Sequence, residues 1–181
     1  MRLLVTGLSR SGTKYLAELL NKAGGNVGHE YVFTVPEPRW GNDSDTLIEV
    51  SWLGAPHLDE VDAPVILLYR DPVRCISSMR INMGTGPYLE YAARYGPENL
   101  GAHWAHWNRM VLEANPVVMR TEDLPLWKLA TMSGLSPVSL ARAEQIISKD
   151  ENHRKPVPLW PVERDDVWET YLELEKRRVR E

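Results

Sequence analysis

The sequence predicts a three-layer α/β/α domain, in which helices cover both faces of a mostly parallel central sheet. Two observations support this prediction. Short apolar runs alternate along the chain with longer segments of helical periodicity, and strands that are joined through helices pair in parallel. The run PVILLY at residues 64–69 is apolar almost throughout, which is typical of a strand buried on both faces of a parallel sheet.

Length and composition indicate one globular domain over residues 1–181, in which 148–181 form a C-terminal loop and helix. Hydrophobic residues make up 43% of the chain and the formal net charge is −4, so no nucleic-acid partner is expected. No apolar run approaches the roughly 20 residues of a membrane helix, and we expect no signal peptide. With Cys75 as its single cysteine, the protein is expected to be cytoplasmic and to have no membrane partner. The oligomeric state stays open.

The first half of the chain contains three predicted strands and one strongly amphipathic helix. The helix is predicted at 12–23, because Leu16, Leu19, Leu20 and Ala23 follow the i, i+3, i+4, i+7 spacing. The other predicted elements are strands at 1–6, 27–30 and 47–52, a turn-rich loop at 34–44, and a short helix or loop at 56–62.

The second half begins with the strand at 64–69. Asp71 as N-cap and Pro72 at the first helical position start a helix that runs to about residue 83. The further predictions are helices at 88–95 and 98–114, a buried strand at 117–119, a helix opened by 121–125, a helix from 136–137 to 147, and a final helix at 165–178.

The turn between the first strand and the first helix, VTGLSRSGTK at residues 5–14, is predicted to bind phosphate. Strand, glycine-containing turn and helix is the geometry in which backbone N–H groups converge on an anion. The glycines have the spacing of the Walker motif G-x-x-x-x-G-K-[ST], but Thr13-Lys14 reverses the Lys-Thr order. The lysine and the Mg²⁺-binding hydroxyl of a nucleoside triphosphatase are therefore out of place. The residues that allow close approach, donate hydroxyls or add positive charge are Gly7, Gly12, Ser9, Ser11, Thr13, Arg10 and Lys14.

A second candidate anion site follows the strand at 64–69. The segment YRDPVR places Arg70 at the strand end, and Ser78 follows eight residues later. Together with the first turn, this pattern resembles the sulfotransferase family that uses 3′-phosphoadenosine-5′-phosphosulfate (PAPS). That family has a [KR]-S-G-T-[TS] loop and a strand ending in R-[ND]-P, with a serine eight residues past the arginine. RTEDL at residues 120–124 is similar to its R-Y-E-D-L segment, and the resemblance extends over residues 2–135.

The resemblance implies a fold related to that of the P-loop nucleoside kinases, metal-independent transfer, and adenosine 3′,5′-bisphosphate as the product. It implies that Arg70 and Ser78 bind the 3′-phosphate. Arg10 matches a catalytic basic residue, and with Lys14 it would stabilise the charge that grows on the leaving phosphate. The residues of the turn that would bind the 5′-phosphosulfate are Ser9, Arg10, Ser11, Gly12, Thr13 and Lys14.

An acceptor hydroxyl also needs a base, and Glu30 is the preferred candidate. Val27–His29 and Glu30 resemble the stretch where carbohydrate-type and bacterial members place an acidic residue. A carboxylate near bound anions should hold its proton more tightly, which suits a base. His29 is the alternative, and if this segment is extended the two side chains point to opposite faces.

Two features depart from the family pattern. The cytosolic small-molecule members have a catalytic histidine after the strand that corresponds to 47–52, whereas His57 comes several residues later here. Their C-terminal Gly-rich R-K-G-x-x-G segment is also absent. The basic stretch NHRK at 152–155, which includes Arg154, is a candidate substitute that would close over the nucleotide.

The leading hypothesis is a sulfotransferase that acts on a hydroxyl of a small molecule or carbohydrate. The first alternative is a small-molecule P-loop kinase that uses Mg-ATP, because Asp71 after the apolar strand loosely imitates a Walker B motif. The second is a catalytically inactive domain that binds a 3′,5′-phosphonucleotide. The sequence does not identify the acceptor.

Overall fold

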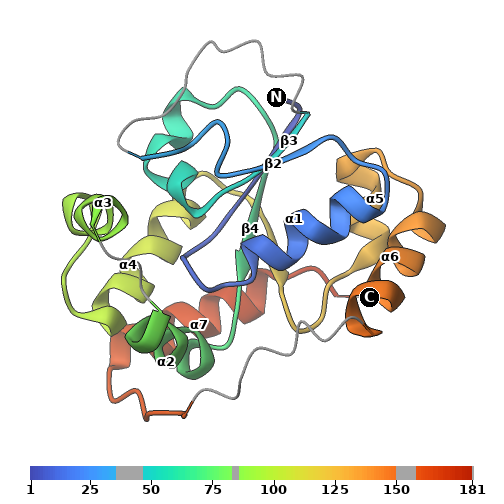
Figure 1. Cartoon of the computed structure of the whole chain (residues 1–181). Helices are drawn as coiled ribbons and strands as arrows, with labels where there is room; N and C mark the ends of the chain where they lie inside the picture. Colours follow the sequence, from blue (N-terminus) through green and yellow to red (C-terminus); the bar gives the residue numbers. More distant parts are fainter. Residues whose placement is uncertain (36–46, 83–85, 150–157, 181) are drawn as a thin grey trace.

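The computed structural model describes residues 1–35, 47–82, 86–149 and 158–180. Its centre is a sheet of five parallel strands in the order β2-β3-β1-β4-β5 (Figure 1). In chain order the strands are β1 (Leu3–Thr6), β2 (Val27–His29), β3 (Ile48–Val50), β4 (Val65–Tyr69) and β5 (Val117–Arg120). The sheet confirms the predicted fold class.

Helices cover both faces of the sheet (Figure 1). One face carries α1 (Thr13–Lys22), α5 (Leu126–Ser133) and α6 (Pro137–Lys149). The other face carries the 3-10 helix η1 (Trp52–Glu60), α2 (Pro72–Asn82), α3 (Pro87–Tyr95), α4 (Leu100–Glu113) and α7 (Asp165–Arg177). The strands alternate between the two layers: in β4, Ile66 and Leu68 pack with the first group and Leu67 and Tyr69 with the second.

Two helix starts differ from the sequence prediction. Helix α5 begins at Leu126, so residues 121–125 lie before the helix and do not form its first turn. The Thr121 hydroxyl donates instead to the carbonyl of Tyr69, at 3.1 Å, and to the carbonyl of Ser11. The segment 56–62, predicted as a short helix or loop, mostly belongs to the 3-10 helix η1, which starts earlier, at Trp52. The Ser51 hydroxyl accepts a hydrogen bond there from the N–H of Leu53 at 3.2 Å.

The C-terminal chain returns to the edge of the sheet. After α7, the N–H of Val179 donates to the carbonyl of Val118 at 2.9 Å, and Arg178 forms an isolated parallel bridge with Val118. Contacts of α7 with α4 and β5 hold this segment against the body of the domain. In the described parts of the chain, no helix combines the length and the apolar character needed to cross a membrane.

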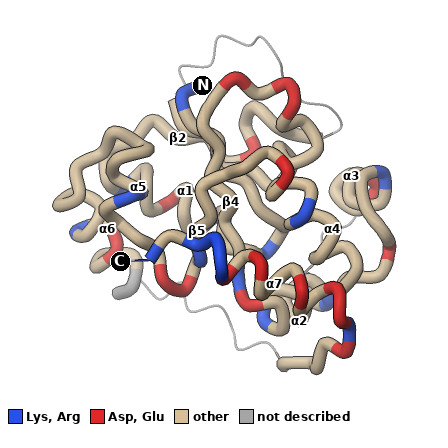
Figure 2. The backbone as a smooth tube through the Cα atoms, turned by 180° about the vertical axis from the view of Figure 1, so that it is seen from behind, with Lys and Arg blue, Asp and Glu red and all other residues tan. Residues whose placement is uncertain are grey.

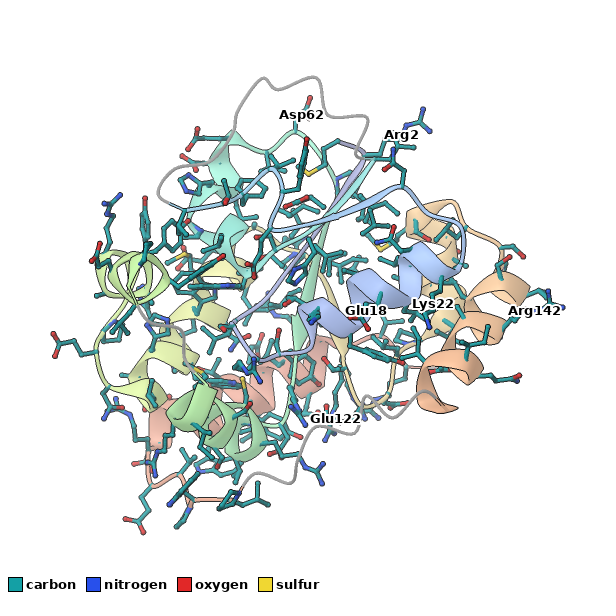
Figure 3. All side chains as sticks on the ribbon, viewed as in Figure 1. Arg2, Glu18, Lys22, Asp62, Glu122 and Arg142 are labelled. Atoms are coloured by element: carbon teal, nitrogen blue, oxygen red, sulfur yellow. The ribbon has the colours of Figure 1, made fainter. Side chains whose placement is uncertain are left out.

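Because all five strands are parallel, their carboxyl ends meet at one edge of the sheet. Arg2 and Asp62, which lie before β1 and β4, are at the opposite end of the molecule from Glu122, which follows β5 (Figure 3). The carboxyl edge therefore gathers the turn before α1, residue 30 after β2, residue 70 after β4 and residues 121–122 after β5.

Candidate functional site

The turn between β1 and α1 takes a backbone shape that requires glycine at two places. A Cβ on Gly7 would lie 2.0 Å from the carbonyl oxygen of Leu68, so β4 leaves no room for a side chain there. Gly12 has φ 108°, and a Cβ would meet Cγ2 of Thr121 at 2.5 Å. Arg10 also lies in the left-handed region, with φ 72°. Left-handed residues in such a turn let successive N–H groups point to one side, which suits an anion.

The N-terminus of α1 faces the same turn. Gly12 is the N-cap residue and has no side chain to occupy the first-turn N–H groups of Thr13 and Lys14. The first turn of α1 carries no acidic residue, and the Lys14 side chain is exposed. The partial positive charge of the helix end and the Lys14 ammonium therefore act together on any anion placed there.

Ser11 and Ser9 contribute differently from the rest of the turn. The N–H of Ser11 donates to the carbonyl of Leu8 at 3.0 Å, so this amide is used within the turn. The Ser11 hydroxyl is buried and finds no hydrogen-bond partner among the described residues. The carbonyl of Ser9 accepts a hydrogen bond from Sγ of Cys75 at 3.5 Å, which ties the turn to α2.

The two candidate anion sites meet in space. Nε of Arg10 donates to Oγ of Ser78 in α2 at 3.1 Å, although the two residues are 68 positions apart. Both Arg10 and Arg70 lie near the buried Cys75: burial raises the pKa of its thiol to about 12, and the two guanidinium groups act in the opposite direction. The structure thus brings Arg10, Ser78 and Arg70 together.

The helix that carries Ser78 begins as predicted. Oδ1 of Asp71 accepts a hydrogen bond from the N–H of Arg74 at 3.0 Å, and the carbonyl of Asp71 accepts one from Cys75 at 2.9 Å. Asp71 is therefore the N-cap of α2 and Pro72 its first helical residue. The carboxylate of Asp71, which in the sequence loosely resembles a Walker B residue, is therefore used to cap α2.

The two candidate bases lie together at the end of β2. Opposite faces were expected only if the segment is extended through Glu30, and it is not: β2 ends at His29 and Glu30 has φ 56°. Nε2 of His29 consequently lies 3.9 Å from Oε1 of Glu30. Partial burial lowers the pKa of His29 and Lys14 lowers it further, while Glu30 and Glu18 raise it. Tyr88, at the start of α3, forms a hydrogen bond with Glu30. His29 therefore lies within reach of the charge of Lys14, and Glu30 lies beside His29.

Sequence reasoning missed Glu49, the middle residue of β3. It is fully buried, and its Oε1 accepts hydrogen bonds from the N–H groups of Tyr31 at 2.8 Å and Val32 at 3.1 Å. Burial raises the pKa of this carboxyl, and Glu30 raises it further. Glu49 therefore shapes the turn that follows Glu30. The sequence does carry a signal for it, because Glu49 is a carboxylate in the middle of a mostly apolar segment, 47–52, that is predicted to be a strand.

Replacing Glu49 by Leu is expected to lower the free energy of unfolding by about 2 kcal/mol relative to Glu49→Gln, because a buried N–H without an acceptor costs about 1–3 kcal/mol. Urea unfolding of both variants at pH 7 measures the difference.

Since burial raises the pKa of Glu49 above its ordinary value near 4.5, the folded state holds the proton of this carboxyl more tightly than the unfolded state. Wild-type protein should therefore lose stability relative to Glu49→Gln as pH rises from that value. Equal stability of Glu49→Leu and Glu49→Gln at pH 7 would contradict the role of Glu49 as a hydrogen-bond acceptor for Tyr31 and Val32.

The other histidines that the structure describes, His57, His103 and His106, are engaged in structural contacts. His57 lies in the aromatic core, with Nδ1 3.1 Å from Oε1 of Glu60 and Nε2 3.0 Å from the hydroxyl of Tyr91. His103 and His106 each contact a backbone carbonyl of the preceding segment. Within the described residues, no group of three or more His, Cys, Asp or Glu side chains is arranged to hold a metal ion. Metal independence stays a prediction.

Arg154, the candidate for closing over the nucleotide, lies outside the described residues. The described chain resumes at Pro158, and the N–H of Trp160 donates to Oγ of Ser77 in α2 at 3.0 Å. The guanidinium of Arg80 lies 5.5 Å from the centre of a Trp160 ring. The chain after residue 157 is thus attached to the helix that carries Ser78.

No family model, curated protein or solved structure matches this chain.

Proposed function

We propose that this protein is a sulfotransferase that moves a sulfuryl group from PAPS to a hydroxyl of a small molecule or carbohydrate. The observation that carries the proposal is the contact between Arg10 and Ser78 at 3.1 Å. It joins the turn before α1 to the helix after β4, so two anion-binding elements share one edge of the sheet. A nucleotide with phosphate groups at both its 3′ and 5′ positions needs such a pair.

The turn before α1 suits the 5′-phosphosulfate. Its left-handed Arg10 and Gly12, the free N-terminal amides of α1 and the exposed Lys14 provide donors and charge for one anionic group. Arg70 and Ser78, next to this turn, would hold the 3′-phosphate. The proposed relation to the P-loop nucleoside kinases agrees with a parallel sheet whose first strand runs into this turn.

In the proposed reaction, the acceptor oxygen forms a bond to sulfur while the bond from sulfur to the bridging phosphate oxygen breaks. The electron pair of that bond leaves with adenosine 3′,5′-bisphosphate, so negative charge grows on its 5′-phosphate. Arg10 and Lys14 would stabilise this charge without a metal ion. The acceptor proton passes to a base, for which Glu30 is the first candidate and His29 the second. Positioning and charge stabilisation supply most of the rate enhancement in such transfers.

The two alternatives make different predictions about ligands. A P-loop kinase would bind Mg-ATP, but Thr13-Lys14 keeps the reversed order and Asp71 serves as the N-cap of α2. An inactive domain would bind the bisphosphate and transfer nothing to any acceptor. The grouping of Glu30 with His29 and Tyr88, where His29 is within reach of the charge of Lys14, favours an active enzyme, because acid–base groups at the anion site have no part in nucleotide binding alone.

Adenosine 3′,5′-bisphosphate is expected to raise the thermal unfolding midpoint of the protein, whereas ATP with Mg²⁺ is not. A ligand at 100 times its Kd adds about 2.7 kcal/mol of stability. Differential scanning fluorimetry with each ligand measures the shift. Arg70→Ala should remove most of it. Arg142→Ala should leave it unchanged, because Arg142 lies on α6, away from the site (Figure 3).

Stabilisation by Mg-ATP without stabilisation by the bisphosphate would favour the kinase and reject the proposal. If the bisphosphate binds, radiolabelled PAPS and a panel of sugars and small alcohols then separate the sulfotransferase from the inactive domain. Label transferred to a member of the panel supports the enzyme. Nucleotide binding without transfer to any hydroxyl acceptor is the behaviour of the inactive domain.

A further inference from the structure

Arg70 is paired with a carboxylate in the free protein. Its Nε lies 3.4 Å from Oε1 of Glu122, the residue two positions after β5. The Arg70 side chain is 24% exposed and that of Glu122 27% exposed, so water screens this pair only in part. Glu122 also acts on the buried Cys75, in the direction opposite to Arg70 and Arg10. Its negative charge therefore lies among the cations of the site.

The other oxygen of Glu122 is bound to a second arginine. Oε2 of Glu122 lies 3.2 Å from Nε of Arg120. Arg120 is held on its other side by Glu175 of α7, at 3.3 Å, and Oε1 of Glu175 also accepts a hydrogen bond from the Tyr69 hydroxyl at 2.7 Å. Basic and acidic segments accordingly lie next to one another along β5 and at its junction with α7 (Figure 2). Arg120 thus provides an anchored position for Glu122 that does not depend on Arg70.

We propose that Glu122 is an internal counterion of Arg70, which the second phosphate of the nucleotide replaces on binding, and that it thereby lowers affinity for a nucleotide with two phosphate positions but not for one that lacks the second phosphate. A dianionic phosphate competes with Glu122 for the same guanidinium and is repelled by its charge. When that phosphate binds, Glu122 keeps its pairing with Arg120. A nucleotide that lacks the second phosphate leaves the pair between Arg70 and Glu122 intact. This inference rests on the proposed function.

The chain offers a matched control in the neighbouring residue. Asp123 has the same charge, but its Oδ2 pairs with Nη1 of Arg178 at 2.9 Å rather than with Arg70. Glu122→Gln and Asp123→Asn therefore make the same change in net charge at adjacent positions. A general electrostatic effect of removing one negative charge should appear in both variants, whereas release of Arg70 should appear only in Glu122→Gln.

The test measures Kd by isothermal titration calorimetry at low ionic strength, where charge effects are least screened. The probes are adenosine 3′,5′-bisphosphate and adenosine 5′-monophosphate. Glu122→Gln is expected to bind the bisphosphate about fivefold more tightly than wild-type protein, the size of a partly exposed ion pair. Affinity for the monophosphate should change by less than about twofold, and Asp123→Asn should match wild-type protein for both probes. In an Arg70→Ala background, Glu122→Gln should give a smaller gain, because only the direct repulsion between Glu122 and the phosphate is then relieved.

Binding of the bisphosphate by wild-type protein tests the proposed function, and the effect of Glu122→Gln on that binding tests the counterion role. If wild-type protein binds the bisphosphate and Glu122→Gln binds it equally or more weakly, the counterion role is wrong and the proposed function stands. An equal gain for both nucleotides, an equal gain in Asp123→Asn, or a gain of the same size without Arg70 also overturns the counterion role. Binding only by Glu122→Gln supports the role in its strongest form. If neither protein binds the bisphosphate, both proposals fail.

Discussion

Glu30→Gln is expected to lower the rate of sulfuryl transfer by about 10²–10⁴-fold, the range that a positioned general base supplies. The substitution keeps the size of the side chain and removes its capacity to take the acceptor proton. Affinity for adenosine 3′,5′-bisphosphate should change little, since binding uses the turn before α1, Arg70 and Ser78. Transfer from radiolabelled PAPS to the best acceptor of the panel measures the rate, and calorimetry measures the affinity.

The geometry at the end of β2 is the reason for this expectation. The left-handed conformation of Glu30 turns its carboxylate away from the course of the strand, and the hydrogen bonds from Tyr31 and Val32 to Glu49 hold the following turn. The hydrogen bond from Tyr88 shows that a hydroxyl can reach this carboxylate. An acceptor hydroxyl would take a similar position.

Two further variants decide between the candidate bases. Glu18→Gln is the control, because Glu18 also acts on His29 but lies on α1 and has no proposed role. It should transfer at the wild-type rate. If Glu30→Gln also keeps that rate, Glu30 is not the base, and His29→Gln should then show the loss. If both substitutions at the end of β2 are silent, the base lies elsewhere in the molecule.

Local signals were sufficient to predict most of the fold. The apolar run that becomes β4 and the amphipathic spacing that becomes α1 are properties of neighbouring residues, and both elements lie where they were expected. Asp71 and Pro72 start α2 for the same reason. The predicted helix start at 121–125 failed because the Thr121 hydroxyl binds the carbonyls of Tyr69 and Ser11, 52 and 110 residues earlier. No local pattern reports contacts of that separation.

The candidate site was predictable only in its parts. The glycines and cations of the turn, and Arg70 with Ser78, could be read from spacing, and the structure places them together. The positive φ of Glu30 could not be predicted from the sequence, because the chain turns there so that the N–H groups of Tyr31 and Val32 reach Glu49 of another strand. The pairing of Arg70 with Glu122 likewise depends on β4 and β5 being neighbours in the sheet.

The second large effect concerns stability and involves His103 of α4. This side chain is 2% exposed, and its Nδ1 lies 3.2 Å from the carbonyl oxygen of Pro97, so Nδ1 carries the proton of the neutral ring. Its Nε2 is buried and has no partner among the described residues. The ring packs against Trp107, with centroids 5.0 Å apart. Protonation of Nε2 would place an uncompensated charge in the core, and burial accordingly lowers the pKa of His103 to about 4.

Acidification from about pH 6.5 to pH 4 is therefore expected to destabilise the protein. In the unfolded chain His103 takes up a proton near its ordinary pKa of 6.5, whereas in the folded protein it does so only near 4. The unfolded state then binds more protons across this interval, and stability falls as pH falls through it. Full loss corresponds to about 3 kcal/mol. Urea unfolding of wild-type protein at pH 7, 5 and 4 measures the change.

Variants on the same helix isolate the contribution of His103 from that of other groups. His103→Gln removes the titration, so its free energy of unfolding should fall less steeply between pH 7 and 4 than that of wild-type protein. Any cost of the substitution itself appears equally at each pH and leaves this slope unaffected. His106, one turn along α4, is exposed and contacts the carbonyl of Tyr95, so His106→Gln should retain the wild-type slope. Parallel slopes for wild-type protein and His103→Gln would show that the buried imidazole is not the group that links stability to pH.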